Sequence, residues 1–63
     1  DVYKRQFLRN VRLEQVRKAL LSGDQTTSVI DVAHRYGFPS RGHFSRYYRD
    51  LFAELPRETL MKR

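Results

Sequence analysis

Two arginines at helical spacing are the side chains in this sequence best suited to bind another molecule. Arg46 and Arg49 lie three residues apart, so on a helix they share one face. The same face carries two small residues, Gly42 and Ser45, beside which a partner could approach the backbone closely. A guanidinium group donates paired hydrogen bonds to guanine O6 and N7 or to a phosphate. The face therefore has the chemistry of a helix that contacts DNA, and the alternative is an arginine pair that only faces solvent.

The other side of the same stretch is apolar and is expected to pack on a core. A helix turns by about 100° per residue, which places Phe44, Tyr48 and Leu51 together. Tyr47 and Phe52 fall at the edges of this apolar side. A helix with an apolar side and a basic side can be held by the protein while it presents arginines outward.

A shorter helix is predicted just before this one. Ser28 and Asp31 have the spacing of a capping box, with Asp in place of the usual Glu or Gln. Apolar residues then recur at helical spacing and form one narrow face: Val29, Val32, Ala33 and Tyr36.

A tight turn is predicted between the two helices. Gly37 can take the left-handed conformation that ends a helix, and Phe38 would seal the turn. Pro39 and Ser40 would begin the next helix. The order helix, glycine turn, helix predicts a helix-turn-helix motif over residues 28–52, whose second helix, 40–52, would enter the DNA major groove.

The rest of the chain also has helical composition, so the predicted fold class is all-α. Residues 2–22 lack proline and glycine and are rich in Arg, Lys, Gln and Leu. Gly23 would end this helix, and a polar connection would run to Thr27. Pro56 suits a first helical position, which predicts a short last helix over 56–62.

The predicted first helix has two apolar stripes that face roughly opposite directions. The first stripe consists of Tyr3, Phe7 and Val11, and the second stripe of Leu13, Val16 and Leu20. A helix whose stripe changes sides packs against two bodies, and the helix-turn-helix supplies only one of them. The chain is therefore expected to be a piece of a longer protein, with self-association through the first stripe or fraying of the first turns when the other body is absent. The alternative is a helix that simply buries more of its circumference.

Composition narrows the classes of function. The 63 residues form one small domain with a net charge of +6, which suits a polyanionic partner. The absence of cysteine excludes a disulfide framework and a cysteine-based zinc site. No stretch resembles a membrane span or a signal peptide, so no membrane partner and a cytoplasmic location are expected.

Catalytic and cofactor chemistry find no support in the sequence. The seven carboxylates are scattered, and no nucleophile–base pair or phosphate-binding glycine loop is present. His43 has only His34 as a possible partner, which favours a structural or phosphate-facing role over metal binding. We expect no enzyme activity, no cofactor and no metal.

Two blocks of the sequence resemble AraC/XylS-type transcriptional regulators. The first is similar to the linker helix of that family: Phe7-Leu8-Arg9-Asn10-Val11-Arg12-Leu13, followed by Leu20-Leu21. The second is similar to the second helix-turn-helix of the family: Val32-Ala33, Gly37-Phe38, His43-Phe44-Ser45-Arg46, Tyr48-Arg49, Phe52 and Pro56. The chain departs from the family pattern at Ala53, where glycine is frequent, at Val16, where alanine is frequent, and in the residues that follow Pro56.

The resemblance implies a homeodomain-like unit in which a long linker helix precedes a helix-turn-helix and a short terminal helix. Residues 1–63 would form the C-terminal part of a DNA-binding domain, with an upstream helix-turn-helix and an effector domain elsewhere in the full protein. Bacterial promoter DNA is the implied partner and RNA polymerase is a further candidate, while activation and repression of transcription both stay open.

The candidate DNA-binding residues are Arg41, Gly42, Ser45, Arg46 and Arg49. By the resemblance, Arg41 aligns with positions that reach bases. Arg46 is expected to contact a base or a phosphate, and Arg49 to clamp a phosphate. Two alternatives stay open: a basic helical module that docks on an acidic protein surface, and nonspecific nucleic-acid binding.

Overall fold

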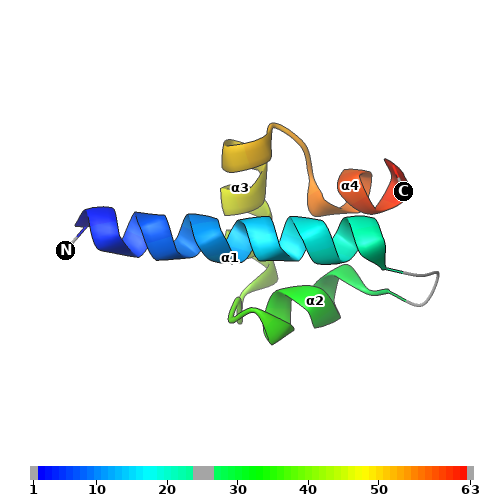
Figure 1. Cartoon of the computed structure of the whole chain (residues 1–63), viewed down its shortest axis with the longest axis horizontal. Helices are drawn as coiled ribbons and strands as arrows, with labels where there is room; N and C mark the ends of the chain where they lie inside the picture. The colour runs from blue at the N-terminus through cyan, green and yellow to red at the C-terminus, as the bar shows by residue number, and fades with distance from the viewer. Residues whose placement is uncertain (1, 24–26, 63) are drawn as a thin grey trace.

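The chain folds into four helices joined by short connections (Figure 1). The computed structural model describes residues 2–23 and 27–62, and the side chains of all of these except Arg41. The helices are α1 (Val2–Ser22), α2 (Val29–Arg35), α3 (Arg41–Phe52) and α4 (Pro56–Lys62). Within the described residues there is no strand, which confirms the expected all-α fold. The polar connection expected before α2 includes residues 24–26, which lie outside the described part of the chain.

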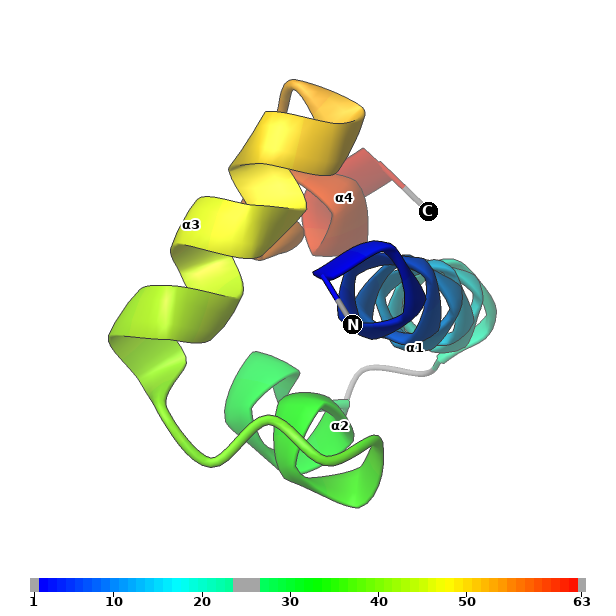
Figure 2. The ribbon, with the colours of Figure 1, turned by 90° about the vertical axis from the view of Figure 1, so that its left-hand side faces the viewer.

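Helix α1 is the long axis of the molecule, which measures 38 × 21 × 19 Å. Helices α2 and α4 lie beside its C-terminal half, and α3 crosses near its middle (Figure 1). Viewed along α1, the other three helices lie on one side of it (Figure 2). The N-terminal half of α1 therefore extends beyond the rest of the fold.

The core forms where the second stripe of α1 meets α2, α3 and the turn between them. Its buried apolar side chains are Leu13, Val16, Leu20, Val32, Ala33, Phe38, Phe44 and Tyr48. Each residue of the second stripe is fully buried, whereas Tyr3, Phe7 and Val11 are exposed by 83%, 66% and 37%. The second stripe of α1 is thus buried and the first stripe is exposed, as their opposite directions suggested.

The expectation that Leu51 belongs to the core side of α3 is wrong, since 39% of this residue is exposed. Tyr47 and Phe52 are more buried than Leu51 and pack against the core. At the last turn of α3 the interior lies toward Phe52, whose ring centroid is 4.6 Å from that of Tyr48. Spacing within one helix does not reveal this shift, because it depends on which other parts of the chain pack against the end of α3.

The turn after α2 is a complete Schellman motif, in which backbone N–H groups satisfy the last carbonyls of the helix. The N–H of Phe38 donates to the carbonyl of Ala33 at 2.9 Å, and that of Gly37 donates to His34 at 3.1 Å. Gly37 has φ = 92°, the left-handed conformation predicted for it. Phe38 is buried, with its ring centroid 5.2 Å from that of Phe44, so it closes the turn as expected.

Side chains cap the starts of α2 and α3. The hydroxyl of Ser28 accepts from the N–H of Asp31 at 3.4 Å, and that of Ser40 accepts from His43 at 3.5 Å. These bonds satisfy donors that have no partner within the first turn of a helix. They confirm Ser28 as the cap of α2 and make Ser40 the cap of α3, whose first residue is Arg41.

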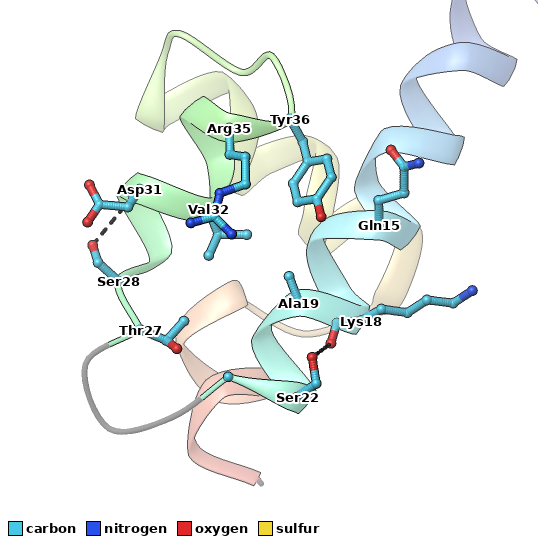
Figure 3. A pocket seen from close by; sticks show the side chains of 11 residues that line it. Gln15, Lys18, Ala19, Ser22, Thr27, Ser28, Asp31, Val32, Arg35 and Tyr36 are labelled. Atoms are coloured by element: carbon cyan, nitrogen blue, oxygen red, sulfur yellow. Dashed lines mark hydrogen bonds between the residues drawn. The ribbon is translucent and has the colours of Figure 1, made fainter.

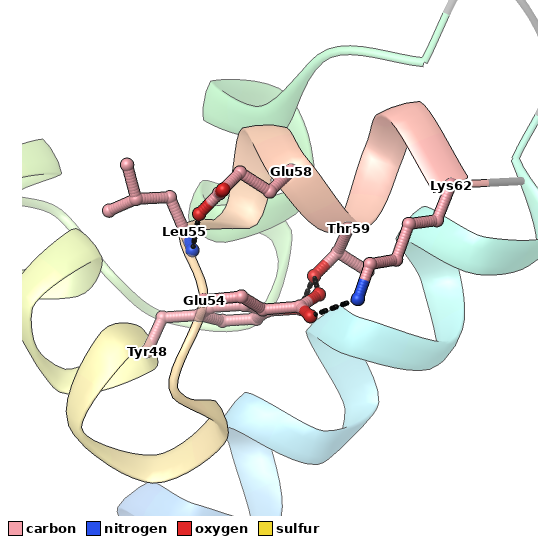
Figure 4. Close-up of polar contacts among 6 residues, drawn as sticks. All are labelled: Tyr48, Glu54, Leu55, Glu58, Thr59 and Lys62. Atoms are coloured by element: carbon pink, nitrogen blue, oxygen red, sulfur yellow. Dashed lines mark hydrogen bonds and ion pairs between the residues drawn. The ribbon is translucent and has the colours of Figure 1, made fainter.

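A hydrogen-bonded chain of side chains joins α3 to α4 (Figure 4). The hydroxyl of Tyr48 donates to Thr59 at 2.7 Å, and Thr59 donates in turn to Glu54. Glu54 also pairs with the ammonium of Lys62 at 2.6 Å. Burial raises the pKa of Tyr48, and the hydrogen bonds from Lys62 and then Thr59 lower the pKa of Glu54.

Candidate nucleic-acid interface

The outward face of α3 presents the predicted arginines to solvent. Arg46 and Arg49 are exposed, as is Gly42, while Ser45 is half-buried. Within residues 2–23 and 27–62, neither arginine forms an ion pair or a side-chain hydrogen bond. Both guanidinium groups are therefore available to an external anion or base edge. Arg41 is the first residue of α3, but its side chain lies outside the described structure.

Gly42 is not required by the packing of the fold. A Cβ atom built on this residue would have no neighbour within 4 Å, and the residue does not have a positive φ. Glycine is less favourable than alanine in a helix, by roughly 0.5–1 kcal/mol at interior positions. A glycine with no internal role fits a place where another molecule comes close to the backbone.

The fold holds this face outward by burying the opposite one. Phe44 and Tyr48 are almost completely buried, with ring centroids 5.8 Å apart. Since about 100° separates successive residues, anchoring these two side chains in the core directs Arg46 away from it. The Ser40 cap fixes where the helix begins, and therefore which residues form its first exposed turn.

Two polar residues on the same side of α3 were not among the predicted site residues. Asp50 is exposed and follows Arg46 by one helical turn, so its carboxylate lies on the same face. A carboxylate can accept a hydrogen bond from cytosine N4, and it repels phosphate. His43 is also exposed, with its ring centroid 6.4 Å from that of Tyr47. The spacing of four residues from Arg46 was a signal that could have identified Asp50.

Two arginines of α1 stack on aromatic rings of α3. The guanidinium carbon of Arg9 lies 4.1 Å from the centroid of the Tyr47 ring, and that of Arg17 lies 5.5 Å from Phe52. Such cation–π contacts hold a guanidinium over the ring face without neutralising its charge. Arg17 remains exposed to solvent while its guanidinium lies over the Phe52 ring. The contact between Arg9 and Tyr47 has no signal in the sequence, because 38 residues separate the two side chains.

An open cavity of about 700 Å³ lies between the C-terminal half of α1 and α2 (Figure 3). Its charged side chains are Lys18, Asp31 and Arg35. Ser22 in its wall donates to the carbonyl of Lys18, and Ser28 is already engaged as a cap. The lining carries no pair of groups arranged for general acid–base or nucleophilic chemistry.

The described residues contain no group of three or more His, Cys, Asp or Glu side chains that could hold a metal ion. None of the helices formed by residues 2–22 and 29–62 is long and apolar enough to cross a bilayer.

Known proteins share this sequence pattern. Residues 4–62 match a family described as a helix-turn-helix domain. The chain is 46% identical over 56 residues to the XylDLEGF operon transcriptional activator 2 of Pseudomonas putida, covering 86% of this chain and 35% of that protein. It is 40% identical over 58 residues to the XylDLEGF operon transcriptional activator 1 of the same species, covering 90% of this chain and 18% of the relative.

A regulator from another species also matches. The regulatory protein HrpB of Ralstonia nicotianae is 39% identical over 56 residues, which cover 87% of this chain and 12% of HrpB. The chain thus spans between 12% and 35% of the length of these three relatives. No solved structure matches it. The family match and these relatives together show that the chain belongs to the AraC/XylS-type family of helix-turn-helix proteins, which bind DNA and regulate transcription.

Proposed function

We propose that this chain binds specific double-stranded DNA sequences by inserting α3 into the major groove of a bacterial promoter. The observation that carries the proposal is the outward face of α3, where exposed arginines without internal partners stand beside a glycine that the fold does not need. An α-helix fits the major groove, and base edges there carry a distinct pattern of donors and acceptors. A promoter target also places the protein in the cytoplasm.

Each residue of the face has a proposed role. Arg46, opposite the buried side of α3, reads a guanine or grips a phosphate, and Arg49, nearer the edge, clamps a phosphate. Ser45 is half-buried, which limits it to a phosphate or a thymine methyl group beside the helix. Gly42 allows close approach of the backbone, and Arg41 contacts a base at the start of the helix.

The full protein is proposed to contain an upstream helix-turn-helix that packs on the first stripe of α1. All three side chains of that stripe are exposed in the structure. Two linked units that each read one groove segment gain affinity from their high effective concentration. The relatives named as transcriptional activators support activation as the outcome, with RNA polymerase as a further partner of the full protein and an effector domain as its regulator.

The decisive experiment is selection of preferred duplexes from a random pool, followed by titration of variants. Arg46→Ala should weaken binding to the preferred duplex by roughly 1–3 kcal/mol and relax its sequence preference. Arg49→Ala should weaken preferred and random duplexes alike and make the salt dependence shallower by about one phosphate contact. Arg57→Ala is the matched control, since Arg57 is an exposed arginine on α4 rather than α3.

The alternatives correspond to distinct results. If Arg46→Ala and Arg57→Ala both bound the preferred duplex as tightly as the parent, α3 would not be the recognition helix. If the selection returned no preferred sequence while binding remained strongly salt-dependent, the chain would be a nonspecific nucleic-acid binder. Absence of duplex binding at low salt would favour a module that docks on an acidic protein surface.

A further inference from the structure

Three arginines of α1 line one cavity beside the turn of the helix-turn-helix motif. The cavity has a volume of about 310 Å³ and is lined by Arg5, Leu8, Arg9, Arg12 and Phe38. We call it the arginine cavity. Its three cations come from successive turns of one helix, and its lining includes no carboxylate. Like charges gathered at one place repel one another, so an anion bound among them would lower their electrostatic free energy.

The charges of the arginine cavity are not neutralised within the described chain. The ion pair between Lys62 and Glu54 lies elsewhere, and no carboxylate in residues 2–23 and 27–62 pairs with the three arginines. The buried Nε of Arg9 has no hydrogen-bond partner among these residues either. The stack on Tyr47 holds the Arg9 guanidinium over the ring. Three uncompensated cations lining one cavity mark it as a place for an anion.

The cavity adjoins the proposed recognition helix. Phe38 in its wall belongs to the turn just before α3, and an Arg12 guanidinium nitrogen would lie 3.7 Å from a Cβ placed on Gly37. Arg9 meets α3 at Tyr47, which is rotated by about 100° from Arg46 around the helix. Arg49 is rotated from Arg46 in the opposite sense, by roughly 60°. The arginine cavity and Arg49 therefore border opposite edges of the face that carries Arg46.

A duplex that accepts a helix in its major groove has a sugar–phosphate backbone along each edge of that groove. Arg49 is placed for one of these backbones. The arginine cavity is placed for the other, and the part of α1 that carries it extends past α3 (Figure 1). Guanidinium groups bind phosphate oxygens through paired N–H donors, and the apolar side chains of Leu8 and Phe38 in the lining weaken competition from water.

We propose that Arg5, Arg9 and Arg12 bind backbone phosphates of the DNA strand at this edge, which makes α1 a second DNA-contacting helix. This inference rests on the proposed function and adds to it a backbone contact made outside the helix-turn-helix. Phosphate contacts carry no base information, so they act on every sequence alike and set how the protein is positioned. The site thus supplies affinity and orientation, while α3 supplies sequence preference.

The test is the salt dependence of binding to a random-sequence duplex, measured by fluorescence anisotropy. The double variant Arg5→Gln/Arg12→Gln should make the slope of log K against log salt shallower by about 0.9 for each lost phosphate contact, or about 2 in total. The control is Lys4→Gln/Lys18→Gln. It removes the same charge from exposed positions of α1 outside the arginine cavity, and should change the slope by less than half as much. Circular dichroism checks that both proteins keep their helices.

Other outcomes overturn the inference in distinguishable ways. Equal slopes for the two double variants would mean that only net charge matters and that the arginine cavity makes no phosphate contact. Inorganic phosphate can also be titrated, with binding followed by chemical-shift changes. If these changes are lost in Arg5→Gln/Arg12→Gln while the duplex slope of that variant stays unchanged, the arginine cavity binds a small anion and not DNA. If either of these results is obtained but Arg46→Ala still loses its sequence preference, the proposed function stands without a phosphate contact at the arginine cavity. If Arg46→Ala has no effect either, the proposed function itself fails.

Discussion

The two halves of α1 each carry a stripe of large apolar side chains, yet only one stripe is buried. The second stripe lies in the core with none of its surface exposed, whereas the first stripe is exposed along its whole length. Both halves form regular helix, so local propensity does not distinguish them. What differs is the material that each half meets, because α2 and α4 lie beside the C-terminal half and the N-terminal half extends beyond them (Figure 1). One half stabilises this chain, and the other leaves its large apolar side chains exposed.

The largest expected effect is the difference in unfolding free energy between a substitution in the second stripe and one in the first stripe. Leu13→Ala should lower the free energy of unfolding by about 2–5 kcal/mol, since it leaves a cavity in the core. Phe7→Ala should change it by less than about 0.5 kcal/mol, because the ring is exposed. Urea unfolding followed by circular dichroism measures both. Equal destabilisation by the two substitutions would show that the first stripe is buried in solution, by a second copy or by a different packing.

A smaller effect is expected from the buried hydroxyl pair between α3 and α4. Thr59→Val removes the acceptor of the Tyr48 hydroxyl and should cost about 1–3 kcal/mol, because a buried donor loses its partner. Thr59→Ser keeps the hydroxyl and should cost less. Since α4 packs beside the C-terminal half of α1, amide hydrogen exchange should accelerate there and remain unchanged around the first stripe. Acceleration that is uniform along α1 would argue against separate roles for its halves.

The smallest effect is a dependence of stability on pH. The pKa of Glu54 is lowered in the folded state, mainly by Lys62 and then by Thr59, so its folded pKa lies below that of the unfolded chain. Its contribution is complete above the ordinary carboxylate pKa of about 4.3 and is lost as the pH falls through the lowered value. In a pH series of thermal unfolding, Glu54→Gln should be less stable than the parent at neutral pH, and the gap should close in acid. If the difference in stability between Glu54→Gln and the parent did not change with pH, ionisation of Glu54 would not be the cause of the pH dependence.

The helix boundaries and the turn were predictable because they depend on neighbours in the sequence. A serine before a helix and a glycine after it act through bonds that span only three to five residues, as Ser28 and Gly37 do. Ala53 also adopts a left-handed conformation, with φ = 59°, at a position where glycine is frequent in the family. The departure noted in the sequence therefore falls on the C-cap of α3, where a Cβ is disfavoured.

Contacts between helices were less predictable. Angular spacing correctly separated the buried Phe44 and Tyr48 from the exposed Arg46 and Arg49, but it placed Leu51 on the wrong side. Spacing specifies where a residue lies around its own helix and contains no information on which neighbour arrives there. The DNA contacts of the exposed face remain predictions for the same reason, since they depend on a partner.

The sequence by itself determined four helices, a capped and glycine-closed turn, and a basic face on α3, because each of these follows from interactions within a few residues or from helical periodicity. Only the tertiary structure decided that Arg9 stacks on Tyr47, that Tyr48 bonds to Thr59, and that three arginines of α1 share one cavity with Phe38. These contacts join residues far apart in the chain. Their geometry depends on where α1, α3 and α4 cross, which is set by the packing of the whole core rather than by any local pattern.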